Sequence, residues 1–228
     1  MGAPPDLSLL LDRVALLAGA ASHDGRRRVL GVTGPPGAGK TTLVEALLAA
    51  STADRRVAGR LAHVPMDGFH LTNSALEELG LGDRKGAPDT FDTSSYAAVL
   101  AAVRDSPRRV VAAPAFDHAV GEPAADALVV PVVADVVLTE GNYLLLDDPA
   151  WQPVRACLDE VWFCALGDDE RRARLVTRHV AAGRDPTDAS AWVQRSDEAN
   201  ARLVTSAGLG LADLVLVDGR VVGGSAAS

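Results

Sequence analysis

One short segment constrains this chain more than any other. Residues 34–41 read Gly-Pro-Pro-Gly-Ala-Gly-Lys-Thr and match the pattern G-x-x-x-x-G-K-[ST] at every fixed position. The apolar, β-branched stretch Arg28–Thr33 before it predicts a buried strand, and the helix formers from Lys40 onward predict a helix. A glycine loop between a strand and a helix is the context in which this pattern binds phosphate groups.

Each fixed position of this loop has a chemical reason. Glycines let backbone N–H groups turn toward phosphate oxygens, where a side chain would block the approach. Lys40 can reach the terminal phosphates of a nucleotide, and the Thr41 hydroxyl is a hard ligand suited to Mg²⁺. Pro35 and Pro36 donate no N–H, but they lie in the early half of the loop. The residues expected to bind the nucleotide here are Gly34, Gly37, Ala38, Gly39, Lys40, Thr41 and Thr42.

Composition restricts the class of protein further. The chain has 228 residues, 48% of them apolar and 23% charged, which is enough to bury the core of one large domain. Its net charge of −8 argues against general binding of nucleic acid or an acidic membrane. The two cysteines are too few for a disulfide framework, and the longest apolar tract, 127–138, is too short to span a bilayer. Since no basic leader precedes the first helix, we expect a soluble, cytoplasmic protein.

Strand and helix patterns alternate along the chain. Apolar strands are expected at 62–66, 134–139, 160–166 and 213–217, and helices at 6–21, 95–104, 168–182 and 189–207. Residues 110–116 and 127–130 are expected to be extended and to pair as a small hairpin, with a short helix and an exposed loop at 71–92 before them. This alternation predicts a parallel sheet covered on both faces. The small, polar tail 223–228 is expected to be disordered.

Two acidic residues end predicted strands. Asp67 follows the second strand, and Glu140 closes a later one. Because ligands of open α/β sheets bind at the carboxyl ends of strands, both carboxylates should face the phosphate crevice. One carboxylate beside a metal ion and one beside an alcohol are what phosphoryl transfer to a hydroxyl requires. The chain has no N-K-x-D motif of guanine-binding switches and no L-S-G-G-Q segment of transporter ATPases.

Several segments together resemble the superfamily of uridine kinases, phosphoribulokinases and bacterial pantothenate kinases, especially its nucleoside/nucleotide kinase-like branch. They are residues 34–42, 66–70, 85–92, 139–142 and 171–185. The resemblance implies the P-loop NTPase fold, with a five-stranded parallel sheet of order 2-3-1-4-5 and helices on both faces. It implies a single domain over 1–222, with an acceptor-side excursion at about 70–130 and a small lid at about 168–190.

The resemblance also implies roles for individual residues. Asp67 would be the general base and help to organise Mg²⁺, which Glu140 and Thr41 would also hold. Lid arginines would close over the phosphates of ATP, with Arg174 and Arg178 in catalysis beside Lys40. The lid candidates are Arg171, Arg174, Arg178 and Arg184, the last of which is expected to bind the nucleotide.

Further residues are candidates for the acceptor pocket. The segment from Lys85 to Asp92 shapes this pocket in similar kinases. His118 stands where relatives commonly carry Arg, and Asn200 resembles a late Asn that pantothenate kinases use on their substrate. The candidates are His70, Lys85, Asp89, Asp92, Phe116, His118 and Asn200.

The expected reaction is ATP + R–OH → ADP + R–O–phosphate, with a nucleoside or sugar as the small-molecule acceptor. Three alternatives stay open at this point. They are a pantothenate kinase-like activity, a kinase for nucleoside monophosphates, and a regulatory nucleotide-binding protein without acceptor chemistry. Dimers are common among similar kinases, so a homodimer is one expectation.

Overall fold

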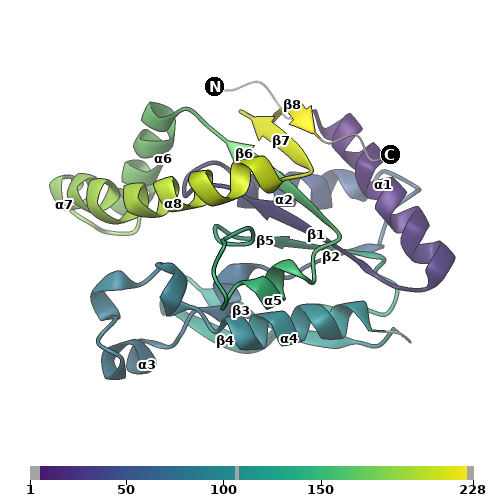
Figure 1. Cartoon of the computed structure of the whole chain (residues 1–228), viewed down its shortest axis with the longest axis horizontal. Coiled ribbons are helices and arrows are strands. Elements are labelled where there is room, and N and C mark those ends of the chain that lie inside the picture. The colour runs from purple at the N-terminus through teal and green to yellow at the C-terminus, as the bar shows by residue number, and fades with distance from the viewer. Residues whose placement is uncertain (1–5, 106–107, 225–228) are drawn as a thin grey trace.

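The centre of the computed structural model, which describes residues 6–105 and 108–224, is a six-stranded sheet (Figure 1). Its strands are β1 (Arg28–Thr33), β2 (Leu61–His63), β5 (Val136–Glu140), β6 (Glu160–Ala165), β7 (Leu214–Val217) and β8 (Arg220–Gly224). They lie in the order β2-β5-β1-β6-β7-β8, with the first five parallel and β8 antiparallel to β7. Numbered along the chain, the five parallel strands have the order 2-3-1-4-5.

Strand β8 corrects the expectation of a disordered tail. Gly223 and Gly224 belong to this strand and pair with Val215 and Leu214 of β7. Pairing uses backbone groups, so a stretch poor in side chains can still add a strand where a neighbour offers an open edge. The prediction was therefore wrong for these two glycines, and residues 225–228 lie outside the described residues.

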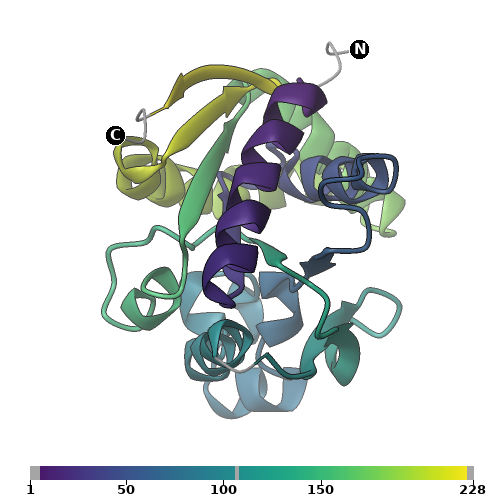
Figure 2. The same ribbon diagram turned by 90° about the vertical axis from the view of Figure 1, so that its right-hand side faces the viewer.

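Helices cover both faces of the sheet (Figures 1 and 2). They are α1 (Leu7–Asp24), α2 (Lys40–Ser51), α3 (Asn73–Glu78), α4 (Thr93–Arg104), α5 (Gln152–Arg155), α6 (Asp168–Ala181), α7 (Pro186–Trp192) and α8 (Glu198–Gly208). Helices α1 and α2 pack into one core cluster, to which they contribute Leu10 and Leu47. Helices α4, α5 and α8 pack into the other with Leu100, Val154 and Val204. The chain thus has the α/β architecture expected from the alternation of its elements.

The central strand β1 separates these two clusters. Val29 packs with the residues of α4, α5 and α8, whereas Leu30 and Val32 pack with those of α1 and α2. Successive side chains of a strand point to opposite faces, so a strand covered on both sides is apolar at nearly every position. This explains the continuous apolar runs of β1 and β5 in the sequence.

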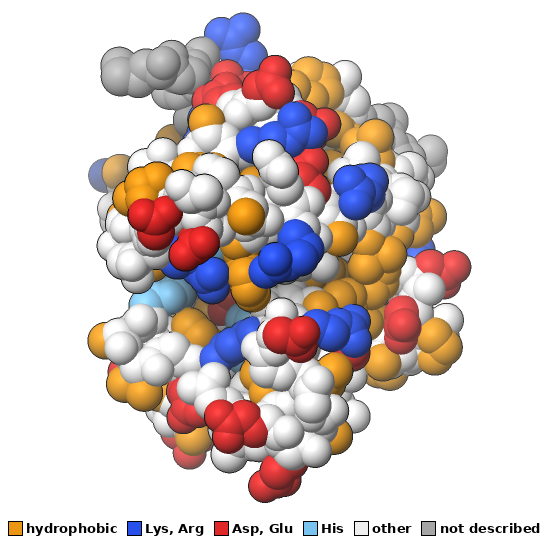
Figure 3. Space-filling model, turned by 90° about the vertical axis from the view of Figure 1, so that its left-hand side faces the viewer, with side chains coloured by type: hydrophobic (Ala, Val, Ile, Leu, Met, Phe, Trp, Pro, Cys, Tyr) orange, Lys and Arg blue, Asp and Glu red, His pale blue; other side chains and the backbone are white. Residues whose placement is uncertain are grey.

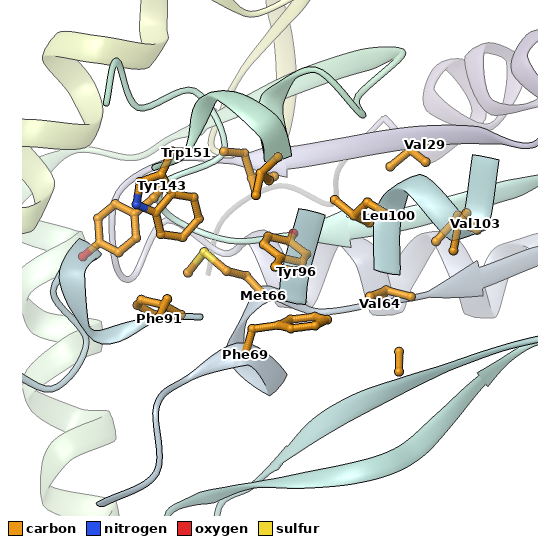
Figure 4. Packing of buried hydrophobic residues seen from close by; sticks show 14 of the residues in the cluster. Val29, Val64, Met66, Phe69, Phe91, Tyr96, Leu100, Val103, Tyr143 and Trp151 are labelled. Carbon is orange, nitrogen blue, oxygen red and sulfur yellow. The ribbon is translucent and has the colours of Figure 1, made fainter. Parts of the chain in front are cut away.

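The core cluster that includes α4, α5 and α8 also holds the turn that follows β2 in place (Figure 4). This turn is the 3₁₀ helix η1 (Met66–Phe69), and its Met66 and Phe69 are buried. The ring centroid of Phe69 lies 4.6 Å from that of Tyr96, whose hydroxyl forms a hydrogen bond with Thr139. Because both ends of η1 are packed, Asp67 between them has a fixed position.

Residues between η1 and β5 form a layer of their own, on the lower side of Figure 1. They comprise α3, the 3₁₀ turns η2 (Gly82–Arg84) and η3 (Pro88–Thr90), α4, and an antiparallel pair of strands, β3 (Val111–Asp117) and β4 (Glu122–Val130). The predicted hairpin is therefore present, with a longer second strand. It lies so close to η1 that a Cβ on Gly68 would be 2.3 Å from the carbonyl oxygen of Pro114.

The opposite side of Figure 1 carries the expected lid residues in α6 and α7. The helix expected at 189–207 begins at Pro186 and is not regular throughout, because a π-helical segment, η4 (Val193–Asp197), lies between α7 and α8. Such segments insert an extra residue per turn and often occur at functional sites. In the described part of the chain, no helix combines the length and apolar character needed to cross a membrane.

Candidate active site

The glycine loop leads from β1 into α2, as its sequence predicted. Gly34, Gly37 and Gly39 all have positive φ angles, a conformation that other residues rarely adopt. A Cβ on Gly34 would lie 2.1 Å from the carbonyl oxygen of Cys164, so the loop also needs glycine for space. Helix α2 begins at Lys40, and no side chain caps it. Its first N–H groups are therefore available to an anion.

Lys40 is buried at the floor of this loop. Its Nζ donates hydrogen bonds to the carbonyl oxygen of Pro35 at 3.1 Å and to Oδ1 of Asn142 at 2.7 Å. Burial lowers the pKa of Lys40, and the nearby Glu140 carboxylate opposes that shift. Asn142 was not among the expected site residues, although its place two residues after the acid that ends β5 is the signal that could have identified it.

Thr41 and Glu140 meet beside the lysine. The Thr41 hydroxyl donates to Oε1 of Glu140 at 3.1 Å. Glu140 is only 6% exposed, and burial raises the pKa of its carboxyl group to about 7. A hydroxyl and a carboxylate are hard oxygen ligands, which fit the few protein contacts that Mg²⁺ makes when nucleotide phosphates supply others. Among the described residues, no group of three or more His, Cys, Asp and Glu side chains forms a metal cage.

Asp67 lies between two cavities. A lid-side cavity of about 600 Å³ and a hairpin-side cavity of about 520 Å³ both have Asp67 in their walls. Among the described residues, its carboxylate has no hydrogen-bond or ion-pair partner. The two cavities also share Gly37, Lys40, Thr41, Phe116, Glu140 and Arg178. The phosphate loop and both acidic strand ends therefore meet at one junction.

The surface is hollowed at this position. Figure 3 shows a groove between an upper and a lower lobe, with Lys, Arg and His side chains gathered around it. From the lid, Arg184 and Trp192 line the lid-side cavity, and Arg174 lines the hairpin-side cavity. Cationic side chains thus surround the junction although the chain as a whole is acidic.

Three of the four lid arginines differ in the side chains that they contact. Arg174 is paired with Glu170 at 2.6 Å, and the Arg184 guanidinium stacks 4.1 Å from the ring centroid of Trp192. Arg171 is buried in an ion pair with Glu198 and lines neither cavity. Its position corrects the expectation that it closes over phosphates, because it anchors α6 to α8.

Aromatic rings form one wall of the lid-side cavity. The His70 ring lies 4.1 Å from that of Phe91 and 4.8 Å from that of Phe116, centroid to centroid. Burial lowers the pKa of His70, and its Nδ1 is 2.8 Å from the carbonyl oxygen of Asp67. Lys85 donates to Oδ1 of Asn73 at 2.6 Å and also lines this cavity.

The remaining acceptor candidates are dispersed. Asn200 lines the lid-side cavity, whereas His118 lines only the hairpin-side one. Asp92 lines neither: its carboxylate caps α4 by accepting hydrogen bonds from the backbone N–H and the hydroxyl of Ser95, at 2.9 and 2.6 Å. Asp89 is paired with Arg84 at the surface. The structure therefore gives Asp92 a capping contact instead of the expected place in the acceptor pocket.

Two histidines that line the cavities were not among the expected site residues. His63, at the end of β2, lines the hairpin-side cavity, and burial lowers its pKa to about 4. His179 lines the lid-side cavity and lies 2.9 Å from Asp197, measured from Nε2 to Oδ2. Neither histidine belongs to a local motif, so only the fold reveals its position.

Comparisons with known proteins found similar sequences and structures. The family model described as "Methylmalonyl Co-A mutase-associated GTPase MeaB" matches residues 11–69, about a quarter of the chain, which include the phosphate loop. A protein of Schizosaccharomyces pombe named "Putative uridine kinase" is 34% identical over 179 residues, which are 75% of this chain and 74% of that protein.

Two solved structures are similar over most of the chain. The crystal structure of a "putative fructose transport system kinase" from Silicibacter sp. TM1040 has a TM-score of 0.75 and 37% identity, and covers 89% of this chain and 98% of that one. The structure of YFH7 from Saccharomyces cerevisiae, described as a "putative P-loop containing kinase with a circular permutation", has a TM-score of 0.78. Its identity is 18%, with 93% and 98% of the two chains covered, so that likeness concerns the fold alone.

Proposed function

This chain belongs to the uridine kinase-like P-loop kinases, and on that premise we propose that it transfers the γ-phosphate of ATP to a hydroxyl group of a nucleoside or a sugar. The observation that carries the proposal is the position of Asp67. Asp67 lies in the wall of both cavities, at the junction with Lys40, Thr41 and Glu140. A phosphate donor and an alcohol can therefore meet beside it.

The phosphate loop and Lys40 bind the donor. The uncapped N-terminus of α2 supplies N–H groups and the positive end of the helix dipole to the phosphates of ATP. Lys40 adds a positive charge at the floor of the loop, where burial strengthens its attraction for a phosphate anion. The nucleotide is thus bound by its phosphates with the terminal one toward the junction.

Thr41 and Glu140 are the residues that would hold Mg²⁺. Their oxygens are 3.1 Å apart and lie beside the loop. The bound ion would neutralise charge that develops on the transferred phosphate. Glu140 must be ionised to bind it, and the raised pKa of this carboxyl means that metal and proton compete for one site.

Asp67 acts as the general base. Since its carboxylate has no partner among the described residues, it is available to accept the proton of the attacking hydroxyl. Proton removal increases the nucleophilicity of the acceptor oxygen as it approaches phosphorus. The packed turn η1 holds the carboxylate in place without blocking it.

Arg174 and Arg178 come from α6, where Arg178 lines both cavities and Arg174 lines the hairpin-side cavity. Both residues are exposed, which allows their side chains to turn toward phosphates when the nucleotide binds. Their positive charge would stabilise the transferred phosphate. Closure of this side of the cavity would also exclude water, so hydrolysis of ATP without an acceptor should be slow.

The lid-side cavity is the acceptor site. Its volume of about 600 Å³ suits a small metabolite, and His70, Phe116 and Lys85 give it both flat apolar surface and hydrogen-bond donors. The names of two relatives, a uridine kinase and a fructose transport system kinase, support a nucleoside or a sugar.

A coupled assay of ADP release tests the proposal. The full chain with Mg²⁺ and ATP is offered uridine, cytidine, fructose, ribulose 5-phosphate and pantothenate in separate reactions. We expect release to depend on uridine, cytidine or fructose, and to disappear in Lys40→Ala. A chain that binds ATP but responds to no acceptor would contradict the proposal and favour a regulatory role, while a response to pantothenate alone would reassign the acceptor class.

A further inference from the structure

The lid-side cavity contains a carboxylate that the proposed reaction does not use. Asp197 ends the π-helical segment η4 and is only 8% exposed. Its Oδ2 is 2.9 Å from Nε2 of His179, and its side chain does not cap α8. Among the described residues, Oδ1 accepts no hydrogen bond. A carboxylate oxygen in a cavity wall with no protein donor is suited to accept one from a ligand.

His179 orients this carboxylate. It comes from the last turn of α6 and, like Asp197, is largely buried, with 17% of its side chain exposed. The pair therefore joins the lid helix to η4 across the wall of the cavity. A carboxylate held by a histidine cannot rotate freely, so its open oxygen has a defined direction.

The other two acidic residues that line this cavity, Asp67 and Glu140, already have a role or a partner. The proposed function assigns Asp67 to the reacting hydroxyl, and Glu140 is bonded to Thr41. Asp92, the acid that similar kinases suggested for the acceptor pocket, caps α4. Asp197 is therefore the carboxylate left to bind the part of the acceptor that does not react.

We propose that Asp197, oriented by His179, binds two hydroxyl groups on adjacent carbons of the acceptor, which is then a vicinal diol such as a sugar or the ribose of a nucleoside. Each oxygen of an ionised carboxylate can accept two hydrogen bonds, so the open Oδ1 can accept from one hydroxyl, and Oδ2 can accept from the neighbouring hydroxyl beside its contact with His179. The two hydroxyls of pantothenate are not on adjacent carbons, so this contact selects against it. The inference rests on the proposed function, since that function assigns the acceptor to this cavity.

Titration calorimetry on the full chain tests this contact without turnover. The protein, saturated with Mg²⁺ and a non-hydrolysable ATP analogue, is titrated with uridine and 2′-deoxyuridine, then with fructose and 3-deoxyfructose. The parent should bind uridine or fructose at least about tenfold more tightly than its deoxy partner. Asp197→Asn should reduce that ratio to below about threefold.

Two further variants make the result specific. Asp188→Asn removes an exposed carboxylate from α7 that lines neither cavity, and it should keep the parental ratio. His179→Gln should weaken diol binding while it preserves binding of the nucleotide analogue. If Asp197→Asn does not bind the nucleotide analogue, the diol binding of His179→Gln tests the proposal in its place.

The proposal is overturned if the parent prefers neither diol, or if Asp197→Asn retains the full preference. This failure is distinct from failure of the proposed function. If Asp197→Asn still transfers phosphate and keeps the parental ratio of diol to deoxy binding, the proposed kinase function stands and the proposed diol contact is wrong. If diol binding depends on Asp197 but no acceptor causes ADP release, the diol contact stands and the proposed kinase function is wrong.

Discussion

Nζ of Lys40 donates a hydrogen bond of 2.7 Å to Oδ1 of Asn142, which joins the phosphate loop to the chain just beyond β5. The backbone carbonyl of Asn142 in turn accepts a hydrogen bond from the Thr33 hydroxyl at 3.0 Å. The lysine is therefore held in place before any nucleotide binds. This arrangement reduces the ordering that binding requires.

Replacement of Asn142 by Ala should weaken ATP binding. Loss of a hydrogen bond to a charged group corresponds to about ten- to hundredfold in affinity, because the lysine is no longer oriented. Titration calorimetry with ATP and Mg²⁺ measures the effect, with Lys40→Ala as the reference for complete loss of this charge. Asn73→Ala removes a similar contact from Lys85 and should leave ATP affinity unchanged. Equal affinities for the Asn142 and Asn73 variants would contradict the orienting role.

Replacement of Asp67 by Asn should separate binding from catalysis. The amide cannot accept the proton of the acceptor, so turnover should fall by about 10²–10⁴. ATP affinity should stay near the parental value, because among the described residues the Asp67 carboxylate forms no hydrogen bond or ion pair with the loop. Steady-state ADP release and ATP titration on the same preparation measure both quantities. Turnover within tenfold of the parent would remove Asp67 from the mechanism.

The strand-loop-helix unit could be predicted because its signals are local. The glycine pattern at 34–41, the apolar strand before it and the helix after it are contiguous in the sequence. Asp67 and Glu140 could be predicted to line the same site because parallel strands bring their carboxyl ends to one edge. The residues that come together at this edge can therefore be predicted without knowledge of side-chain packing.

Residues whose role depends on distant partners were harder to assign. Arg171 and Arg178 lie on the same predicted helix. Arg171 anchors this helix because it pairs with the buried Glu198, whereas Arg178 lines the cavity. The pair of His179 and Asp197 depends on the π-helical segment, which periodicity did not predict. Sequence patterns define helix faces, but the partner of each face is set by tertiary packing.

Variants of Asp92 can show whether this residue caps α4 or binds the acceptor. Asp92→Ala should cost about 1 kcal/mol of the free energy of unfolding, because the N-terminus of α4 loses its cap. Asp92→Ser should retain most of that stability, since Ser also caps helices. Urea denaturation measures both variants, and acceptor KM should remain within about threefold of the parent in each. An acceptor KM raised more than tenfold in the stable Ser variant would return Asp92 to the acceptor pocket.

Gly37 links the phosphate loop to the lid helix. Its φ is +81°, and a Cβ there would lie 2.9 Å from Cγ of Leu175 and 3.0 Å from the carbonyl oxygen of Arg171. Gly37→Ala should therefore destabilise the fold by at least about 2 kcal/mol, from backbone strain and a clash. Gly59 has a φ of +71° with open space around it, so Gly59→Ala should cost only about 1 kcal/mol. Equal losses in urea denaturation would mean that α6 does not rest on the loop.

Glu140 should make the stability of the free protein depend on pH. Burial raises the pKa of its carboxyl from 4.5 to about 7, so between these values the folded chain binds a proton that the unfolded chain does not. Stability from this group is complete below about pH 4.5 and is lost as the pH rises to about 7, by at most about 3 kcal/mol. Urea denaturation without Mg²⁺ or nucleotide at pH 5 and pH 8 measures the loss. Glu140→Gln does not titrate and should show a smaller difference between the two pH values; the same difference in both proteins would mean that this carboxyl is ionised throughout the range.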